Sequence, residues 1–252
     1  MSMVIQPQDL KASARSFDEV YQLSTMTSLL DGVYVSDKTF SELKKQGDFG
    51  IGTFEHLDGE LIAFDNEFYQ LKSDGTANIV KDEDKSPFCS LTHFKTDLTY
   101  NIERPMTREE FEQLIKDLVR SENLFYAIRV DGVFKEMKTR TVSYQEEAIP
   151  MTEAVKVQPI FTFNDISGTL AGFWTPAYAQ GIAVPGFHFH FIDDERTGGG
   201  HVFDYVIEQG KIQISTKTHM NLHLPETDAF LNANLSRSDL ADELEKTEGM
   251  AE

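Results

Sequence analysis

The feature that most limits the fold of this chain is a series of short alternating segments separated by turn residues. After Gly47, hydrophobic and polar residues alternate in runs of four to six, and the pairs Asp58-Gly59, Asp65-Asn66 and Asp74-Gly75 separate these runs. Alternation with a period of two places successive side chains on opposite faces of a strand, and Asp-Gly pairs favour tight hairpin turns. This region is therefore predicted to form an antiparallel β-meander.

Helical patterns interrupt or flank the strands at a few places. Ser16–Leu30 begins with the spacing of a capping box, Thr39–Lys45 repeats this spacing, and Thr107–Ser121 has its apolar residues on one face. Asp239–Thr247 predicts a short helix near the C-terminus, whereas Val157–Thr216 consists almost entirely of predicted strands. The expected fold class is α+β, mostly antiparallel or mixed β-sheet in two packed β-rich halves with a few short helices.

The boundary between the two halves is expected near Pro150, where polar residues precede a new strand-rich stretch. Residues 1–150 would form an N-terminal β-sheet half with helices. Residues 151–252 would form a C-terminal β-rich half that carries the candidate site described below. The two halves are expected to pack closely enough that they could constitute one domain.

The charge and cysteine content of the chain restrict its partners. Its formal net charge of −19 would repel nucleic acid and anionic membrane surfaces. The N-terminal sequence lacks the basic start and long apolar run of a signal peptide, and no segment reaches the length of a membrane span, so a cytoplasmic location is expected. A single cysteine, Cys89, excludes an intramolecular disulfide and a multi-cysteine zinc or iron–sulfur site. A bound metal would therefore need His and carboxylate ligands.

Three histidines form the clearest candidate site. His188 and His190 alternate with phenylalanines within Phe187–Phe191, so both imidazoles are expected on one face of a strand. His201 follows a glycine-rich turn, and a hairpin across that turn would bring it beside the pair. Three His ligands leave part of a zinc coordination sphere open, as in catalytic sites. Taken alone, His188 and His190 could equally be a structural pair that forms hydrogen bonds in a polar cleft. The addition of His201 behind a glycine turn makes a metal site the favoured interpretation.

Several motifs taken together resemble the alpha-acetolactate decarboxylase family. One runs from Gly52 to Glu60, and the others are Gly168–Pro176, Gly181–Ile182, Gly186–Phe191 and Gly199–Val202. The similarity extends from about Thr27 to Gly249. It implies an enzyme that converts 2-acetolactate to acetoin and carbon dioxide, folded as two β-rich halves and commonly a homodimer. It also implies a zinc ion bound by His188, His190 and His201.

The resemblance assigns roles to four further residues. Glu60, Arg140 and Glu248 match the family's remaining active-site carboxylates and arginine, and Thr53 matches a pocket residue. Local sequence alone would instead make Glu60 a solvent-facing hairpin residue, and Arg140 would be one of many solvated strand arginines. The active-site roles of Glu60 and Arg140 are therefore implied by the family resemblance and not by the local sequence.

The implied reaction needs a group that stabilises negative charge and a proton donor. Loss of carbon dioxide leaves an enediolate, whose charge a metal chelated by the hydroxyl and ketone oxygens would stabilise. Arg140 would hold the departing carboxylate by paired hydrogen bonds. Either Glu60 or Glu248 would deliver the proton. Glu243 or Glu245 could take the place of Glu248, because short helical tails align poorly.

Two other functions fit parts of the pattern. A cupin-type metal-dependent oxygenase or isomerase would use His188, His190 and Glu195 as ligands. A noncatalytic metal- or sugar-binding β module would bind its ligand without turnover. Neither alternative explains the match at Gly168–Pro176. Ligand spacing does not identify the metal, because zinc, iron and manganese all accept three imidazoles with carboxylate help.

Overall fold

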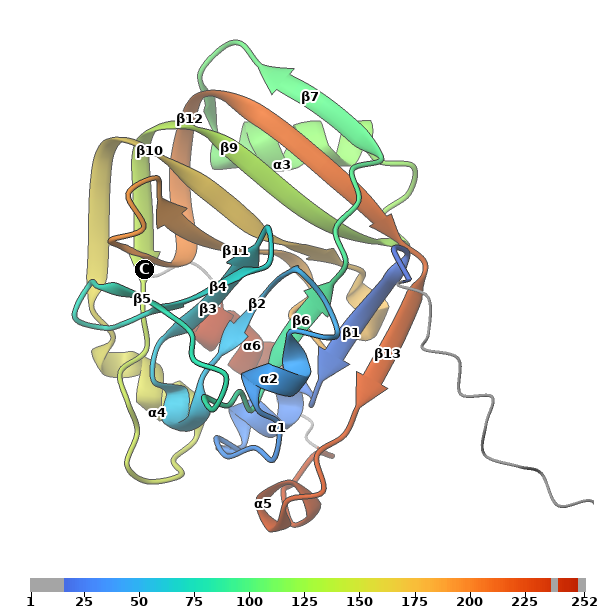
Figure 1. The fold of residues 1–252 in the computed structure, drawn as a ribbon, viewed down its shortest axis with the longest axis vertical. Helices are drawn as coiled ribbons and strands as arrows, with labels where there is room; N and C mark the ends of the chain where they lie inside the picture. The colour runs from blue at the N-terminus through green and yellow to red at the C-terminus, as the bar shows by residue number, and fades with distance from the viewer. Residues whose placement is uncertain (1–15, 237–239, 249–252) are drawn as a thin grey trace, which may run out of the picture.

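The computed structural model describes residues 16–236 and 240–248, which form two β-sheets with short helices around them (Figure 1). The first sheet has seven strands in the order β13-β1-β6-β2-β3-β4-β5. Its strands are β1 (Glu19–Leu23), β2 (Phe49–Thr53), β3 (Glu60–Phe64), β4 (Glu67–Leu71), β5 (Ala77–Ile79), β6 (Cys89–Thr92) and β13 (His219–His223). The β1–β13 pair is parallel and the other pairs are antiparallel, so the sheet is mixed.

The second sheet contains the longest strands of the protein. They run in the order β11-β10-β9-β12-β7, and β8 pairs with β12. The strands are β7 (Leu98–Ile102), β8 (Met106–Thr107), β9 (Phe125–Arg140), β10 (Ile160–Thr175), β11 (Gly186–Asp193) and β12 (Gly199–Lys217). Because β11 also pairs with β12, the four strands β9 to β12 close on themselves near the turn between β11 and β12.

Six helices, most of them short, lie among the described residues that connect or follow the strands. They are α1 (Met26–Leu30), α2 (Phe40–Leu43), α3 (Arg108–Leu118), α4 (Met151–Ala154), α5 (Asp228–Leu231) and α6 (Leu240–Glu248), with short 3-10 turns at Glu55–Leu57, Val155–Val157 and Ala177–Ala179. In Figure 1, α3 lies within the arch of β9 and β12, whereas α1, α4 and α6 lie in the lower part of the molecule. No helix in the described ranges combines the length and apolar character that crossing a membrane requires.

The predicted fold class is confirmed, and several local predictions hold for clear physical reasons. Asp65 and Asn66, in the turn between β3 and β4, both have positive φ angles of 54° and 64°, as a tight hairpin turn requires. The N-termini of α2 and α3 carry the expected capping boxes. Thr39 pairs with Glu42 in α2, and Thr107 pairs with Glu110 in α3. The predicted C-terminal helix corresponds to α6, although Asp239 lies outside the described residues.

The predicted helix from Ser16 to Leu30 is wrong in its first half. Residues Glu19–Leu23 form β1, and the helix begins only at Met26, capped by the side chain of Thr25. β1 lies between β13 and β6, and its residues from Val20 onward are buried. Pairing with both neighbours satisfies the backbone of β1, and this tertiary pairing overrides the helical spacing of its apolar residues.

The sheets do not divide at the predicted boundary near residue 150. β9 precedes that boundary but lies between β10 and β12, which follow it, and β13 completes the first sheet. The division into residues 1–150 and 151–252 therefore remains a prediction about domains and does not describe the sheets.

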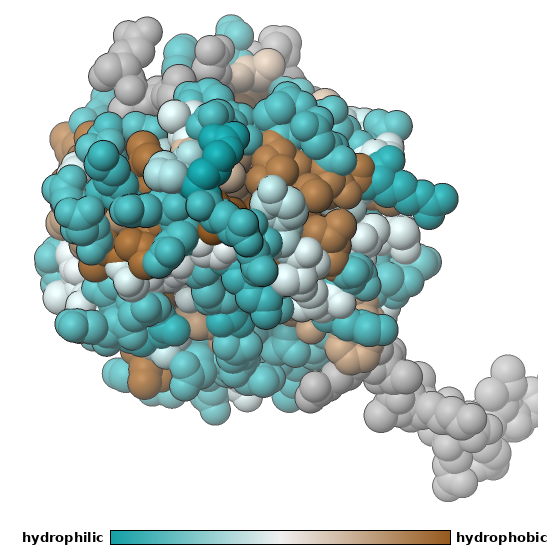
Figure 2. Space-filling view, turned by 90° about the horizontal axis from the view of Figure 1, so that it is seen from above, coloured by the Kyte–Doolittle hydropathy of each residue, from teal (hydrophilic) through white to brown (hydrophobic). Residues whose placement is uncertain are grey.

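The face shown in Figure 2 is mainly hydrophilic with a few hydrophobic patches, which agrees with the strongly acidic composition.

Candidate metal and active site

The hairpin of β11 and β12 brings three imidazoles together. His188 and His190 lie on one face of β11, and His190 is paired in register with His201 on β12. One ring nitrogen from each residue lies within 4.8 Å of the others, and His188 Nε2 is 3.2 Å from His201 Nδ1. His190 and His201 are buried, and His188 is partly buried. These three nitrogens could hold one metal ion.

The protonation state of the imidazoles suits a cation. Burial lowers the pKa of His190 to about 4, and it lowers the pKa values of His188 and His201 well below 6.5. The rings are therefore neutral near pH 7, the form that binds metals. His190 Nδ1 lies 2.6 Å from the carbonyl oxygen of Leu61, so Nδ1 must carry the hydrogen and Nε2 keeps its lone pair. That Nε2 is buried without a hydrogen-bond partner among the described residues, as a metal ligand would be before binding.

Two carboxyl groups face the imidazoles. Glu60 begins β3, and its Oε2 lies 3.6 Å from His190 Nε2. Glu248 ends α6, and its Oε2 lies 3.7 Å from Nε2 of both His188 and His201. Burial, with the charge of Glu248, raises the pKa of Glu60 to about 8, and burial raises the pKa of Glu248 to about 7. Each carboxyl group can therefore hold a proton near neutral pH.

Arg140 supplies the positive charge of the site. It ends β9, is paired in register with His201, and is only 4% exposed. Its Nη2 donates a 2.7 Å hydrogen bond to the carbonyl oxygen of Thr247, which attaches the last turn of α6 to β9. Burial lowers the pKa of Arg140, while the carboxyl groups of Glu248 and Glu60 oppose this change. A guanidinium keeps its charge in proteins, so Arg140 remains a cation that can pair with a substrate carboxylate.

These groups line one cavity together with apolar side chains. Thr53 also lines the cavity, and its hydroxyl donates a 2.8 Å hydrogen bond to the Gly59 carbonyl, immediately before Glu60. The apolar lining consists of Met26, Leu29, Leu57, Phe88, Val142, Met151 and Val155. The cavity thus combines polar groups suited to a small anion with a surface suited to short alkyl substituents.

Two of the residues named in the alternative predictions, Glu195 and Glu243, do not line the cavity. Glu195, the extra ligand of a cupin-type site, is exposed in the turn between β11 and β12 and does not line the cavity. Glu243 does not line it either, and the side chain of Glu245 lies outside the described part of the chain. Sequence reasoning did not find the carbonyl group of Leu61, because a backbone acceptor carries no side-chain signal.

Comparison with known proteins agrees with this site. A sequence profile described as alpha-acetolactate decarboxylase matches residues 20–237. The chain belongs to the alpha-acetolactate decarboxylase family. The family member from Bacillus subtilis is 60% identical over 93% of this chain and 92% of its own, and the member from Klebsiella aerogenes is 44% identical over 90% and 88%.

Solved structures of the family share this fold. The crystal structure of the Bacillus subtilis alpha-acetolactate decarboxylase is 60% identical and has a TM-score of 0.91, covering 92% of this chain and 99% of its own. A Staphylococcus aureus protein described as similar to alpha-acetolactate decarboxylase is 31% identical and has a TM-score of 0.87, covering 91% and 99%. This chain therefore shares its overall fold with both of these proteins.

Proposed function

We propose that this protein decarboxylates 2-acetolactate to acetoin and carbon dioxide in the cavity that contains His188, His190 and His201. Its family membership makes it an enzyme that decarboxylates acetolactate. The assignment to this cavity rests on the convergence of three neutral imidazoles, the buried carboxyl group of Glu60, the largely buried carboxyl group of Glu248 and the buried guanidinium of Arg140. Decarboxylation of a 2-hydroxy-3-keto acid needs a cation for the carboxylate, stabilisation of the charge left behind, and one proton.

Zn²⁺ is the proposed cofactor, held by His188, His190 and His201. The fit rests on the neutral state of the three rings and on the unpartnered Nε2 of His190. When bound, the ion would supply Lewis-acid stabilisation of the oxygen that becomes negatively charged as carbon dioxide leaves.

The protein's own side chains would perform the remaining steps. Arg140 would hold the substrate carboxylate, because its side chain lines the cavity and, among the described residues, Thr247 accepts a hydrogen bond from only one of its five N–H groups. Glu60 or Glu248 would then deliver a proton to the carbon that has lost carbon dioxide, since burial allows either to hold a proton near neutral pH. The apolar lining would exclude water from the charged intermediate.

The proposal is tested by following acetoin formation from 2-acetolactate, with a protein-free sample to measure the spontaneous reaction. Chelation should abolish the activity of the wild type, and Zn²⁺ should restore it. His201→Ala should remain inactive under both conditions. His219→Ala is the matched control, because His219 is an exposed histidine on β13, paired with Asp18, and should behave as the wild type. Full activity in a sample verified to be metal-free would refute the metal assignment.

The proton donor is identified by comparing Glu60→Gln with Glu248→Gln at matched zinc content. The variant that keeps zinc but loses turnover by about 10²- to 10⁴-fold marks the general acid. Full turnover in both variants would exclude both residues from that role. A homodimer and a cytoplasmic location remain predictions.

A further inference from the structure

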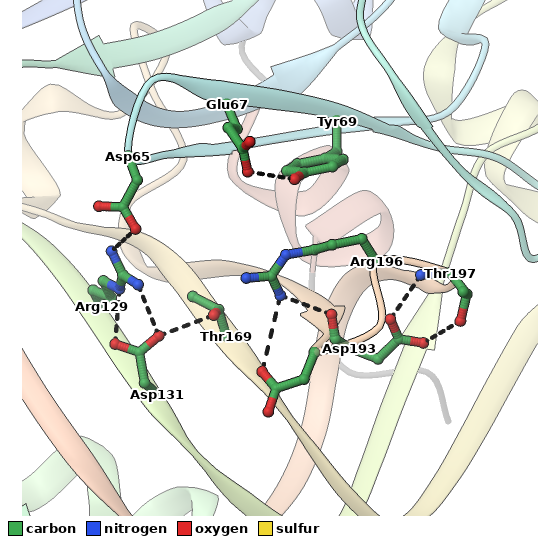
Figure 3. Close-up of polar contacts among 10 residues, drawn as sticks. Asp65, Glu67, Tyr69, Arg129, Asp131, Thr169, Asp193, Arg196 and Thr197 are labelled. Carbon is green, nitrogen blue, oxygen red and sulfur yellow. Dashed lines mark hydrogen bonds and ion pairs between the residues drawn. The ribbon is translucent and has the colours of Figure 1, made fainter.

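The turn between β11 and β12 is attached to the first sheet (Figure 3). The guanidinium of Arg196 lies over the rings of Phe64 and Tyr69, at 4.8 and 6.0 Å from their centroids. The carbonyl oxygen of Thr197 accepts a 3.0 Å hydrogen bond from the backbone N–H of Ala77, at the start of β5. The loop that joins the strands of the three histidines is therefore docked on the sheet that carries Glu60.

Hydrogen bonds within the turn hold it in one conformation. The carboxylate of Asp193 is buried and accepts hydrogen bonds from the backbone N–H and the hydroxyl of Thr197, both at 2.7 Å. The carbonyl oxygen of Asp193 accepts a 2.8 Å hydrogen bond from Arg196 Nη1. Arg196 has a φ of 59°, a left-handed conformation that non-glycine residues adopt only when their surroundings hold them there.

The same turn determines the register of the two strands. Gly199 is paired with Ile192, and a Cβ on Gly199 would lie 1.9 Å from the carbonyl oxygen of Phe191, so only glycine permits this approach. The register continues to the His190–His201 pair. A change in the turn would therefore be transmitted to the relative positions of the three imidazoles.

β3 is held by the second sheet near both of its ends. Near its start, the Leu61 carbonyl oxygen is bonded to His190. At its end, Phe64 lies under two guanidinium groups, because Arg129 Cζ is 5.0 Å from the ring and Arg196 Cζ is 4.8 Å from it. Arg129 is itself held by Asp65 at 2.8 Å and by Asp131 at 2.8 and 3.0 Å (Figure 3). Glu60 begins this strand, so its distance from the histidines depends on these contacts.

We propose that Arg196, which donates to the Asp193 carbonyl in a turn closed by the Asp193–Thr197 hydrogen bonds, is a positioning residue that sets the placement of Glu60 relative to the three imidazoles. The inference rests on the proposed function, since it assumes that these groups act together on one substrate. Arg196 is not among the residues that line the cavity. It acts by docking the hairpin on β3, and a displacement of about 1 Å at a reacting centre can cost about 10²-fold in rate.

The experiment compares three variants loaded with Zn²⁺ at a temperature where all are folded. Arg196→Met keeps most of the apolar stem but removes the guanidinium, and Thr197→Val removes only the hydroxyl that binds Asp193. Arg104→Met is the matched control, because Arg104 is a surface arginine paired with Glu110. The measurements are the rate of zinc release to a chelator, kcat and KM.

Arg196→Met should release zinc about tenfold faster and lose about tenfold in kcat, a change of about 1.4 kcal/mol, with KM within about twofold of the wild type. Thr197→Val should shift both quantities in the same direction by less, and Arg104→Met should match the wild type. Wild-type zinc release and kcat in Arg196→Met would overturn the positioning role alone, even with a lower melting temperature. A wild type that binds no zinc would overturn the proposed metal site and this inference with it.

Discussion

The stability of the metal-free protein should fall as pH rises through the range in which Glu60 ionises. The pKa of Glu60 is raised from 4.5 to about 8, with burial as the largest cause. Between these two values the unfolded chain has lost the proton and the folded chain keeps it, so the folded state binds more protons. This contribution to stability is fully present below pH 4.5 and is lost as pH rises through about 8. At about 1.4 kcal/mol per pKa unit, the full change attributable to Glu60 is on the order of 5 kcal/mol, of which about 4 kcal/mol falls between pH 5 and about 8.5.

Urea unfolding of the metal-free wild type and of Glu60→Gln between pH 5 and about 8.5, at one protein concentration, tests this prediction. Glutamine does not ionise, so the stability of the variant relative to the wild type should rise with pH by about 4 kcal/mol. Glu208→Gln, at an exposed position of β12, is the control and should show no such change. Zn²⁺ should reduce the effect, because a cation beside the imidazoles stabilises the ionised carboxylate. A stability difference that does not change with pH would refute the reasoning.

Three further substitutions test other parts of the site. His190→Ala removes one of three nitrogen donors, so zinc affinity measured by calorimetry should fall by at least about 100-fold, and an unchanged affinity would exclude His190 as a ligand. Arg140→Lys keeps the charge but loses the planar fork, so the KM for 2-acetolactate should rise about tenfold or more; a KM equal to that of the wild type would show that Arg140 does not bind the carboxylate. Gly59→Ala would place a Cβ 2.3 Å from the Leu71 carbonyl oxygen at a φ of 94°, so urea unfolding should show a loss of about 1–3 kcal/mol, and wild-type stability would contradict the required left-handed turn.

Short-range sequence patterns are sufficient to predict the hairpin that carries the three histidines. The alternation of His188 and His190 with phenylalanines determines which face of β11 they share, and the glycine turn brings β12 back so that His201 lies opposite His190. Both effects act within one hairpin, so no information about the rest of the chain is needed. The helix prediction was wrong at Glu19–Leu23 because long-range pairing decides the structure there. The partners of β1 are β6 and β13, which are far away in the sequence.

The sequence by itself determined the strand-rich class and the hairpin of the three histidines. Through the family motifs it also identified Glu60, Arg140 and Glu248 as candidate site residues. Only the tertiary structure decided that these last three side chains meet in one cavity, since they come from β3, β9 and α6. It also decided their chemistry, because the raised pKa values of the two carboxyl groups arise from burial by residues distant in sequence. Periodicity is a local property that a sequence displays directly, whereas desolvation depends on which segments pack together.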